Sequence, residues 1–131
     1  MVKLFTDGGA RGNPGPAAGA AILYNNEGVV MCKGSEYYGT ATNNQAEYRA
    51  LMLGLTLAVE NNISDVVAFL DSELVVKQLN GQYRVKDSAL ASLFSAVKNL
   101  ESKFSSVTYS HIPRSQNKEA DLLVNTELDR N

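Results

Sequence analysis

The chain has 131 residues, of which 44% are hydrophobic and 20% are charged, a balance typical of one globular domain rather than a disordered or fibrous protein. Its formal net charge of −2 implies no broad basic surface, although basic side chains can still gather on one face. A single cysteine, no leader-like segment at the start, and apolar stretches far shorter than the ~20 residues that span a bilayer predict one cytoplasmic domain over residues 1–131.

Hydrophobic periodicity divides the chain into strands and helices. Alternating apolar and polar residues predict strands over residues 2–6 and 106–112. A run of small residues predicts a strand over 17–24, a β-branched and apolar run predicts one over 65–70, and residues 29–38 form the third predicted strand. Residues 8–16 are rich in Gly and Pro and predict a loop. Helical patterns predict helices over residues 45–61 (capped by residues 42–44), 72–80, 88–104, and from 118 to the end.

This order of elements predicts an α/β fold with a mixed five-stranded sheet and helices on both faces. The first three strands form an antiparallel meander, and the fourth and fifth are added in parallel through right-handed helical crossovers. The first, fourth and fifth strands are therefore expected to be parallel neighbours. Functional sites in such sheets lie beyond the carboxyl ends of the strands.

Asp7 and Asp71 follow the first and fourth predicted strands. Because adjacent strands lie ~4.8 Å apart, carboxylates at matching ends can approach each other. Their repulsion would then favour a cation between them. Asp is also a common turn former after a strand, which is the alternative for each residue alone.

Glu47 and Asp121 lie near the starts of two predicted helices, on the stripes that face the sheet. Ala50 and Gly54 continue the stripe of Glu47, and Val124 continues that of Asp121. An acid in the first turn also suits the helix dipole, but its burial is costly unless it is paired or bound to metal. Four converging carboxylates would suit two Mg²⁺ or Mn²⁺ ions, an arrangement that cleaves phosphodiesters.

Four segments carry a family resemblance: residues 6–9 with 13–16, residues 42–47, residues 70–72 and residues 117–121. In this order and spacing they resemble the type 1 ribonuclease H family across essentially the whole chain. The resemblance implies a ribonuclease H-like fold and metal-dependent endonucleolytic hydrolysis of the RNA strand of RNA–DNA hybrids, with 3′-hydroxyl and 5′-phosphate ends. It assigns two Mg²⁺ or Mn²⁺ ions to Asp7, Glu47, Asp71 and Asp121, with no membrane and no obligate protein partner.

The resemblance also implies substrate contacts. It assigns Asn13, Asn43 and Asn44 to the hybrid and Thr42 to a phosphate of the DNA strand. Small polar side chains suit the shallow minor groove and 2′-hydroxyls of an A-like duplex. A turn or helix-cap role is the alternative for each asparagine.

The chain departs from many relatives, which carry a basic, often Trp-rich protrusion that grips the hybrid. Residues 82–87, where it would lie, are short and contain two basic residues, and the chain has no Trp. We therefore expect the form without a basic protrusion and without an appended hybrid-binding domain.

Relatives also place a mobile histidine before the last acid. His111 has a fitting position, but Val107, Tyr109 and His111 alternate on one strand face, which predicts a fixed, partly packed ring. Residues 112–115 resemble instead the shorter loop of archaeal and some bacterial members, where an arginine stands nearby. This favours Arg114, which stays charged and can orient a phosphate but cannot shuttle a proton.

Two other functions are compatible with the same sequence. The chain can be a catalytically idle nucleic-acid-binding module of the same fold, or a nuclease acting on another duplex such as double-stranded RNA. The presence of all four acids favours the nuclease. No phosphate-loop or dinucleotide fingerprint supports a metabolic enzyme.

Overall fold

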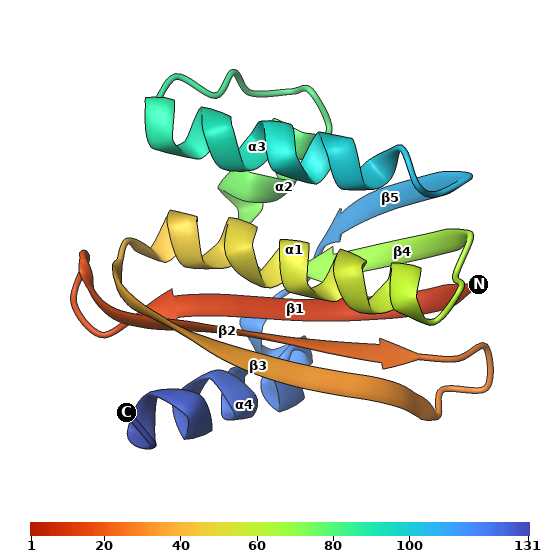
Figure 1. Cartoon of the computed structure of the whole chain (residues 1–131), viewed down its shortest axis with the longest axis horizontal. Helices are drawn as coiled ribbons and strands as arrows, with labels where there is room; N and C mark the ends of the chain where they lie inside the picture. The colour runs from red at the N-terminus through yellow and green to blue at the C-terminus, as the bar shows by residue number, and fades with distance from the viewer.

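A computed structural model describes residues 1–131 as a three-layer structure with a sheet in the middle (Figure 1). The strands are β1 (Val2–Ala10), β2 (Gly15–Tyr24), β3 (Val30–Ala41), β4 (Asp65–Leu70) and β5 (Ser106–His111). The helices are α1 (Asn43–Glu60), α2 (Glu73–Leu79), α3 (Ser88–Glu101) and α4 (Lys118–Asp129), and a 3₁₀ turn, η1 (Arg114–Gln116), precedes α4. Figure 1 shows α1, α2 and α3 on one side of the sheet and α4 on the other.

The five strands lie in the order β3-β2-β1-β4-β5. β1 pairs antiparallel with β2, and β2 with β3, whereas β1–β4 and β4–β5 are parallel pairs. These pairings confirm the predicted mixed sheet. They follow the general rule that strands joined by helical crossovers are parallel and strands joined by tight turns are antiparallel.

The larger core lies between the sheet and helices α1, α2 and α3. The stripe expected on α1 is confirmed, since Ala50, Leu51, Gly54 and Ala58 are buried. A Cβ on Gly54 would come within 2.8 Å of the Leu4 side chain, so α1 lies very close to β1. This close packing holds α1, which carries Glu47, against β1, which carries Asp7.

The smaller core lies under α4, where Val124 and Leu128 pack against Ala18 and Ala20 of β2. β2 is buried on both faces, and its small alanines let helices approach from both sides. Glu127 is also buried and accepts a hydrogen bond of 2.7 Å from Ser35 of β3. The inward orientation predicted for this side of α4 is confirmed by the buried Val124.

The structure corrects the predicted loop over residues 8–16. β1 continues through Gly8 and Gly9 and pairs with β2 as far as Ala10–Ala17. The glycines weaken the strand pattern, but a Cβ on Gly8 would come within 2.3 Å of the Ala46 backbone. Gly8 is therefore required by the approach of α1 within a paired strand, and not by a turn.

Other bounds shift by a few residues at the ends of β2, β3 and α3. Residues 80–87 connect α2 directly to α3 without a helix of their own, which confirms that the basic protrusion is absent. None of the helices combines the length and apolar character needed to cross a membrane.

Candidate active site

Asp7, on β1, and Asp71, which directly follows β4, occupy equivalent positions along two neighbouring parallel strands. The last β1–β4 pair is Phe5–Phe69, and both aspartates come two residues later. The sequence predicts a first strand that ends near Asp7. Instead β1 continues past it, paired only with β2, because β4 ends at Leu70 and leaves this side of β1 open. The opening beside β1, beyond the end of β4, holds the site.

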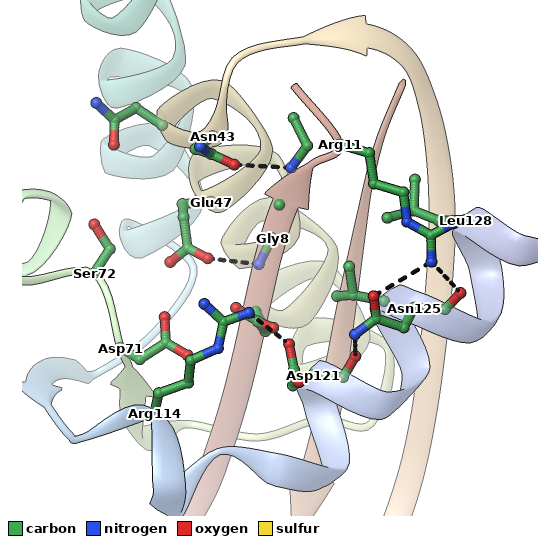
Figure 2. A pocket seen from close by; sticks show the side chains of 15 residues that line it. Gly8, Arg11, Asn43, Glu47, Asp71, Ser72, Arg114, Asp121, Asn125 and Leu128 are labelled. Atoms are coloured by element: carbon green, nitrogen blue, oxygen red, sulfur yellow. Dashed lines mark hydrogen bonds and ion pairs between the residues drawn. The ribbon is translucent and has the colours of Figure 1, made fainter. Parts of the chain in front are cut away.

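Glu47 reaches the same opening from the first turns of α1. Thr42 caps this helix: its hydroxyl accepts a bond of 3.1 Å from the Gln45 amide, while the Gln45 side chain accepts one of 2.9 Å from the Thr42 amide. The Gly8 amide donates a hydrogen bond of 2.6 Å to Oε1 of Glu47 (Figure 2). Oε2 of Glu47 is buried and has no hydrogen-bond partner, so one oxygen is held and the other is available to a ligand.

Three carboxylates converge at this point. Asp7, Glu47 and Asp71 each place an oxygen within 4.8 Å of the others. Burial raises the pKa of Asp7 to about 7, and the neighbouring charge of Asp71 acts in the same direction. Burial, followed by the charges of Asp7 and Asp71, also raises the pKa of Glu47 well above its usual value. Without a cation, this cluster therefore disfavours its fully charged form.

Asp121 faces the same pocket from the first turn of α4. It lies close enough to Asp7 for its charge to raise the pKa of that residue. Nη2 of Arg114, in η1, lies 3.0 Å from Oδ1 of Asp121, and this ion pair raises the pKa of Arg114 (Figure 2). The structure thus brings together all four predicted acids, with one arginine at their edge.

His111 lies outside this pocket. The prediction of a partly packed ring is wrong, because His111 is exposed while Tyr109 on the same strand face is buried. β5 is an edge strand, so its last residue has a strand neighbour on one side only, Leu70. Arg114, in contrast, lines the pocket.

The predicted substrate-contact residues surround the start of α1. Asn43 and Asn44 line the pocket. Oδ1 of Asn43 accepts a bond of 2.8 Å from the Ala10 amide, and Oδ1 of Asn13 accepts one of 3.0 Å from the Asn43 amide. Thr42 and Asn13 do not line the pocket; both make local bonds at the start of the helix. Hydrogen bonds at the start of α1 therefore account for Asn13, as its turn or cap alternative predicts, and for Thr42, which lies in the predicted cap.

Arg11 and Asn125 form part of the pocket wall. Neither residue was predicted as a site residue from the sequence. Nη2 of Arg11 lies 2.7 Å from Asp129 and donates longer bonds to Asn125, which tie the loop after β1 to α4. Arg11 is an exposed residue in a Gly-rich segment, so nothing in its local pattern places it beside α4.

Asn117, just before α4, was also missed as a site residue. Its Nδ2 donates to the Thr6 carbonyl at 2.8 Å and to Oδ2 of Asp71 at 3.2 Å, and its side chain is almost fully buried. An asparagine before a helix indicates a cap, and only the placement of β1 and β4 beside it shows the contact with Asp71.

The donor set fits divalent metal ions. The converging groups are carboxylate oxygens, which Mg²⁺ and Mn²⁺ prefer. Their pocket has a volume of about 240 Å³, and the cations that line it are Arg11, paired with Asp129, and Arg114, paired with Asp121. The unpartnered Oε2 of Glu47 is a buried acceptor that a metal ion would satisfy.

A family model described as "Reverse transcriptase-like" matches residues 5–127 of this chain. A ribonuclease HI from Halobacterium salinarum is 39% identical over 128 residues, and a bifunctional protein from Mycobacterium tuberculosis is 39% identical over 129 residues. Each alignment covers 98% of this chain, which spans 64% of the first relative's length and 35% of the second's.

Solved structures resemble the chain over nearly its whole length. The N-terminal RNase H domain of the M. tuberculosis protein has a TM-score of 0.95 at 39% identity and 98% coverage of both chains. RNase H1 of H. salinarum has a TM-score of 0.96 at 38% identity, covering 99% of this chain and 98% of its own. LC11-RNase H1, from a compost metagenome, was solved with an RNA/DNA hybrid and has a TM-score of 0.94 at 36% identity, with the same coverage.

Proposed function

The chain belongs to the ribonuclease H family, and from that premise we propose that it is a metal-dependent endonuclease that hydrolyses the RNA strand of RNA–DNA hybrids, leaving 3′-hydroxyl and 5′-phosphate ends. The observation that carries the proposal is the convergence of three carboxylates, two of them buried, within 4.8 Å. The hybrid in the LC11-RNase H1 structure supports the choice of substrate. We propose residues 1–131 as one catalytic unit.

Each acid has a distinct place in the proposed metal site. Asp7, Glu47 and Asp71 would hold one Mg²⁺ or Mn²⁺ ion, and Asp121, beside Asp7, would complete the donors for a second. When bound, such a pair supplies an activated water and stabilises charge on the leaving oxygen. The Gly8 amide keeps Oε1 of Glu47 in place, so that the unpartnered Oε2 would be the oxygen that holds the ion.

The chain's own groups control protons and charge at the site. Because the pKa values of Asp7 and Glu47 are raised, protons must leave these carboxyls for an ion to bind near neutral pH. Arg114 holds a permanent positive charge at the pocket edge, where we propose that it orients a phosphate of the RNA strand. His111, exposed and outside the pocket, has no role in this proposal.

The start of α1 forms the proposed substrate side of the pocket. Asn44 lines the pocket, and no hydrogen bond within the chain occupies its side chain, so it is the freest of the predicted contacts to reach a base edge or 2′-hydroxyl. Asn43 reaches the pocket while holding Ala10. We assign Asn13 and Thr42 to the same surface, Asn13 toward the hybrid and Thr42 toward a DNA phosphate.

A cleavage assay tests the proposal. RNA labelled at one end is presented as a hybrid, as an RNA duplex and as a single strand, with Mg²⁺ or Mn²⁺ titrated and with Asp7→Asn as the control. We expect cleavage of the hybrid alone, with either ion, and products that a polymerase can extend. Binding without cleavage at any metal concentration would indicate an idle module, and equal cleavage of the RNA duplex would indicate a broader nuclease.

A further inference from the structure

Asn117 links β1, which carries Asp7, to Asp71, which directly follows β4. It lies directly before α4 and its side chain is 1% exposed. Nδ2 donates to the Thr6 carbonyl of β1 at 2.8 Å and to Oδ2 of Asp71 at 3.2 Å. One amide group therefore contacts the residue before Asp7 and the carboxylate of Asp71.

Capping of α4 does not explain this side chain. A capping asparagine accepts bonds from the amides of the first helical turn, but the Asn117 side chain makes no such bond. The helix instead uses the Asn117 backbone carbonyl, which accepts from the Asp121 amide at 3.0 Å. The backbone of Asn117 thus holds the helix that carries Asp121, while its side chain holds Asp71.

Space filling does not explain it either. Oδ1 of Asn117 is buried without a hydrogen-bond partner, an unfavourable arrangement that an apolar side chain would avoid. Both partners of Nδ2 are acceptors, so the position requires a donor. A lysine or arginine donor would add a charge competing with a metal ion, whereas an amide holds the carboxylate without neutralising it.

We propose that Asn117 is a positioning residue, which orients the Asp71 carboxylate and fixes its distance from Asp7 and Asp121 so that the acids can share metal ions. Its bond to Oδ2 leaves Oδ1 of Asp71 for coordination. The inference rests on the proposed function, because it assumes that the acids bind divalent cations. Groups that orient metal ligands in this way typically change metal affinity by about 10–100-fold.

Truncation of two buried amides separates this role from a purely structural one. Gln78 is also buried, and its Oε1 accepts a bond of 2.7 Å from Tyr48 in the core, outside the pocket. Asn117→Ala and Gln78→Ala are compared by Mn²⁺ titration calorimetry without nucleic acid, by kcat and KM on the hybrid, and by thermal unfolding.

We expect both variants to lose stability, but only Asn117→Ala to bind Mn²⁺ about tenfold or more weakly and to lose kcat with little change in KM. On an Asp71→Asn background, Asn117→Ala should change Mn²⁺ affinity by less than about twofold, because the two residues act together. Two results would overturn the proposal. One is unchanged Mn²⁺ affinity in Asn117→Ala, and the other is a loss of Mn²⁺ affinity on the Asp71→Asn background as large as in the wild-type background.

A measurement on the wild-type protein covers the case in which Asn117→Ala does not fold. During Mg²⁺ titration, the side-chain amide NMR signals of Asn117 should shift along the binding curve while those of Gln78 stay in place. Unmoved Asn117 signals would refute the role. If the wild-type protein binds Mn²⁺ but cleaves no hybrid, the proposed function fails while the affinity comparison still decides the role of Asn117.

Discussion

The Gly8 amide donates a hydrogen bond of 2.6 Å to Oε1 of Glu47, joining β1 to α1 one residue beyond Asp7. The bond depends on how closely the two elements approach, since the Ala46 backbone lies where a Cβ of Gly8 would stand. The close approach of Asp7 and Glu47 therefore depends on a glycine at position 8, which has no side chain.

Gly8→Ala should destabilise the protein and weaken metal binding. The new Cβ would lie 2.3 Å from the backbone of Ala46, which cannot rotate away, so α1 must move. We expect a loss of about 2–3 kcal/mol in the free energy of unfolding, as for other overpacked sites, measured by urea denaturation, and weaker Mn²⁺ binding in the folded fraction.

Gly9→Ala is the matched control for that prediction. Its Cβ would meet only Oδ1 of Asn43, at 4.0 Å. Its stability should be unchanged or higher by about 0.5 kcal/mol, because alanine restricts the unfolded chain more than glycine does. Equal effects of the two substitutions would show that the α1 contact is not the cause.

The stability of the metal-free protein should fall as pH rises toward neutrality. The pKa of Asp7 is raised from 3.8 to about 7 in the folded state, so between these values the folded chain retains a proton that the unfolded chain has lost. Folding stability then decreases with pH, by up to about 4 kcal/mol across this window at about 1.4 kcal/mol per pKa unit. The raised pKa of Glu47 acts in the same direction.

Urea denaturation in EDTA at several pH values measures this slope. Saturating Mg²⁺ should flatten it, because bound metal favours the charged carboxylates. Asp7→Asn should also reduce the slope, since it removes the titrating group. A metal-free wild type whose stability rises steadily from pH 5 to pH 7 would be incompatible with these shifted pKa values.

Periodicity and connection rules were sufficient to predict the sheet. They placed Asp7 and Asp71 at the ends of neighbouring strands, because helical crossovers make the first, fourth and fifth strands parallel. The inward position of Glu47 followed in the same way from the small, apolar stripe of Ala50 and Gly54. These inferences use local pattern and a general rule of handedness.

Features that depend on a contact distant in sequence were missed. Gly8 and Gly9 belong to a segment whose Gly and Pro content predicts a loop. Only their pairing with β2 and the approach of α1 show that they lie in a strand. Glu127 has the pattern of a solvent-facing acid, yet it is buried and contacts Ser35 of β3. The role proposed for Asn117 depends on Asp71, which a single sequence does not place beside it.

Asp71→Asn should abolish cleavage while preserving the fold. The amide that replaces the carboxylate is a poor ligand for Mg²⁺, but its oxygen can still accept the bond from Asn117. Loss of the Asp71 charge relieves repulsion on Asp7 and Glu47, so the metal-free variant should be more stable by about 1 kcal/mol. Turnover should fall at least about 1,000-fold, with hybrid affinity within severalfold of wild type; near-normal turnover would contradict the assignment of Asp71.

Arg114→Ala and His111→Ala should differ sharply in activity and hardly at all in stability. The Arg114 side chain is 77% exposed, so loss of its ion pair with Asp121 should cost less than about 1 kcal/mol in thermal or urea unfolding. Turnover of the hybrid should nevertheless fall about 10–100-fold, because a charge positioned at the pocket edge is lost. Arg114→Lys should recover part of the lost turnover, since an ammonium keeps the charge but not the planar fork.

The turnover of His111→Ala should remain within about twofold of wild type, as expected for an exposed residue outside the pocket. Full turnover in Arg114→Ala together with a large loss in His111→Ala would reverse the assignment.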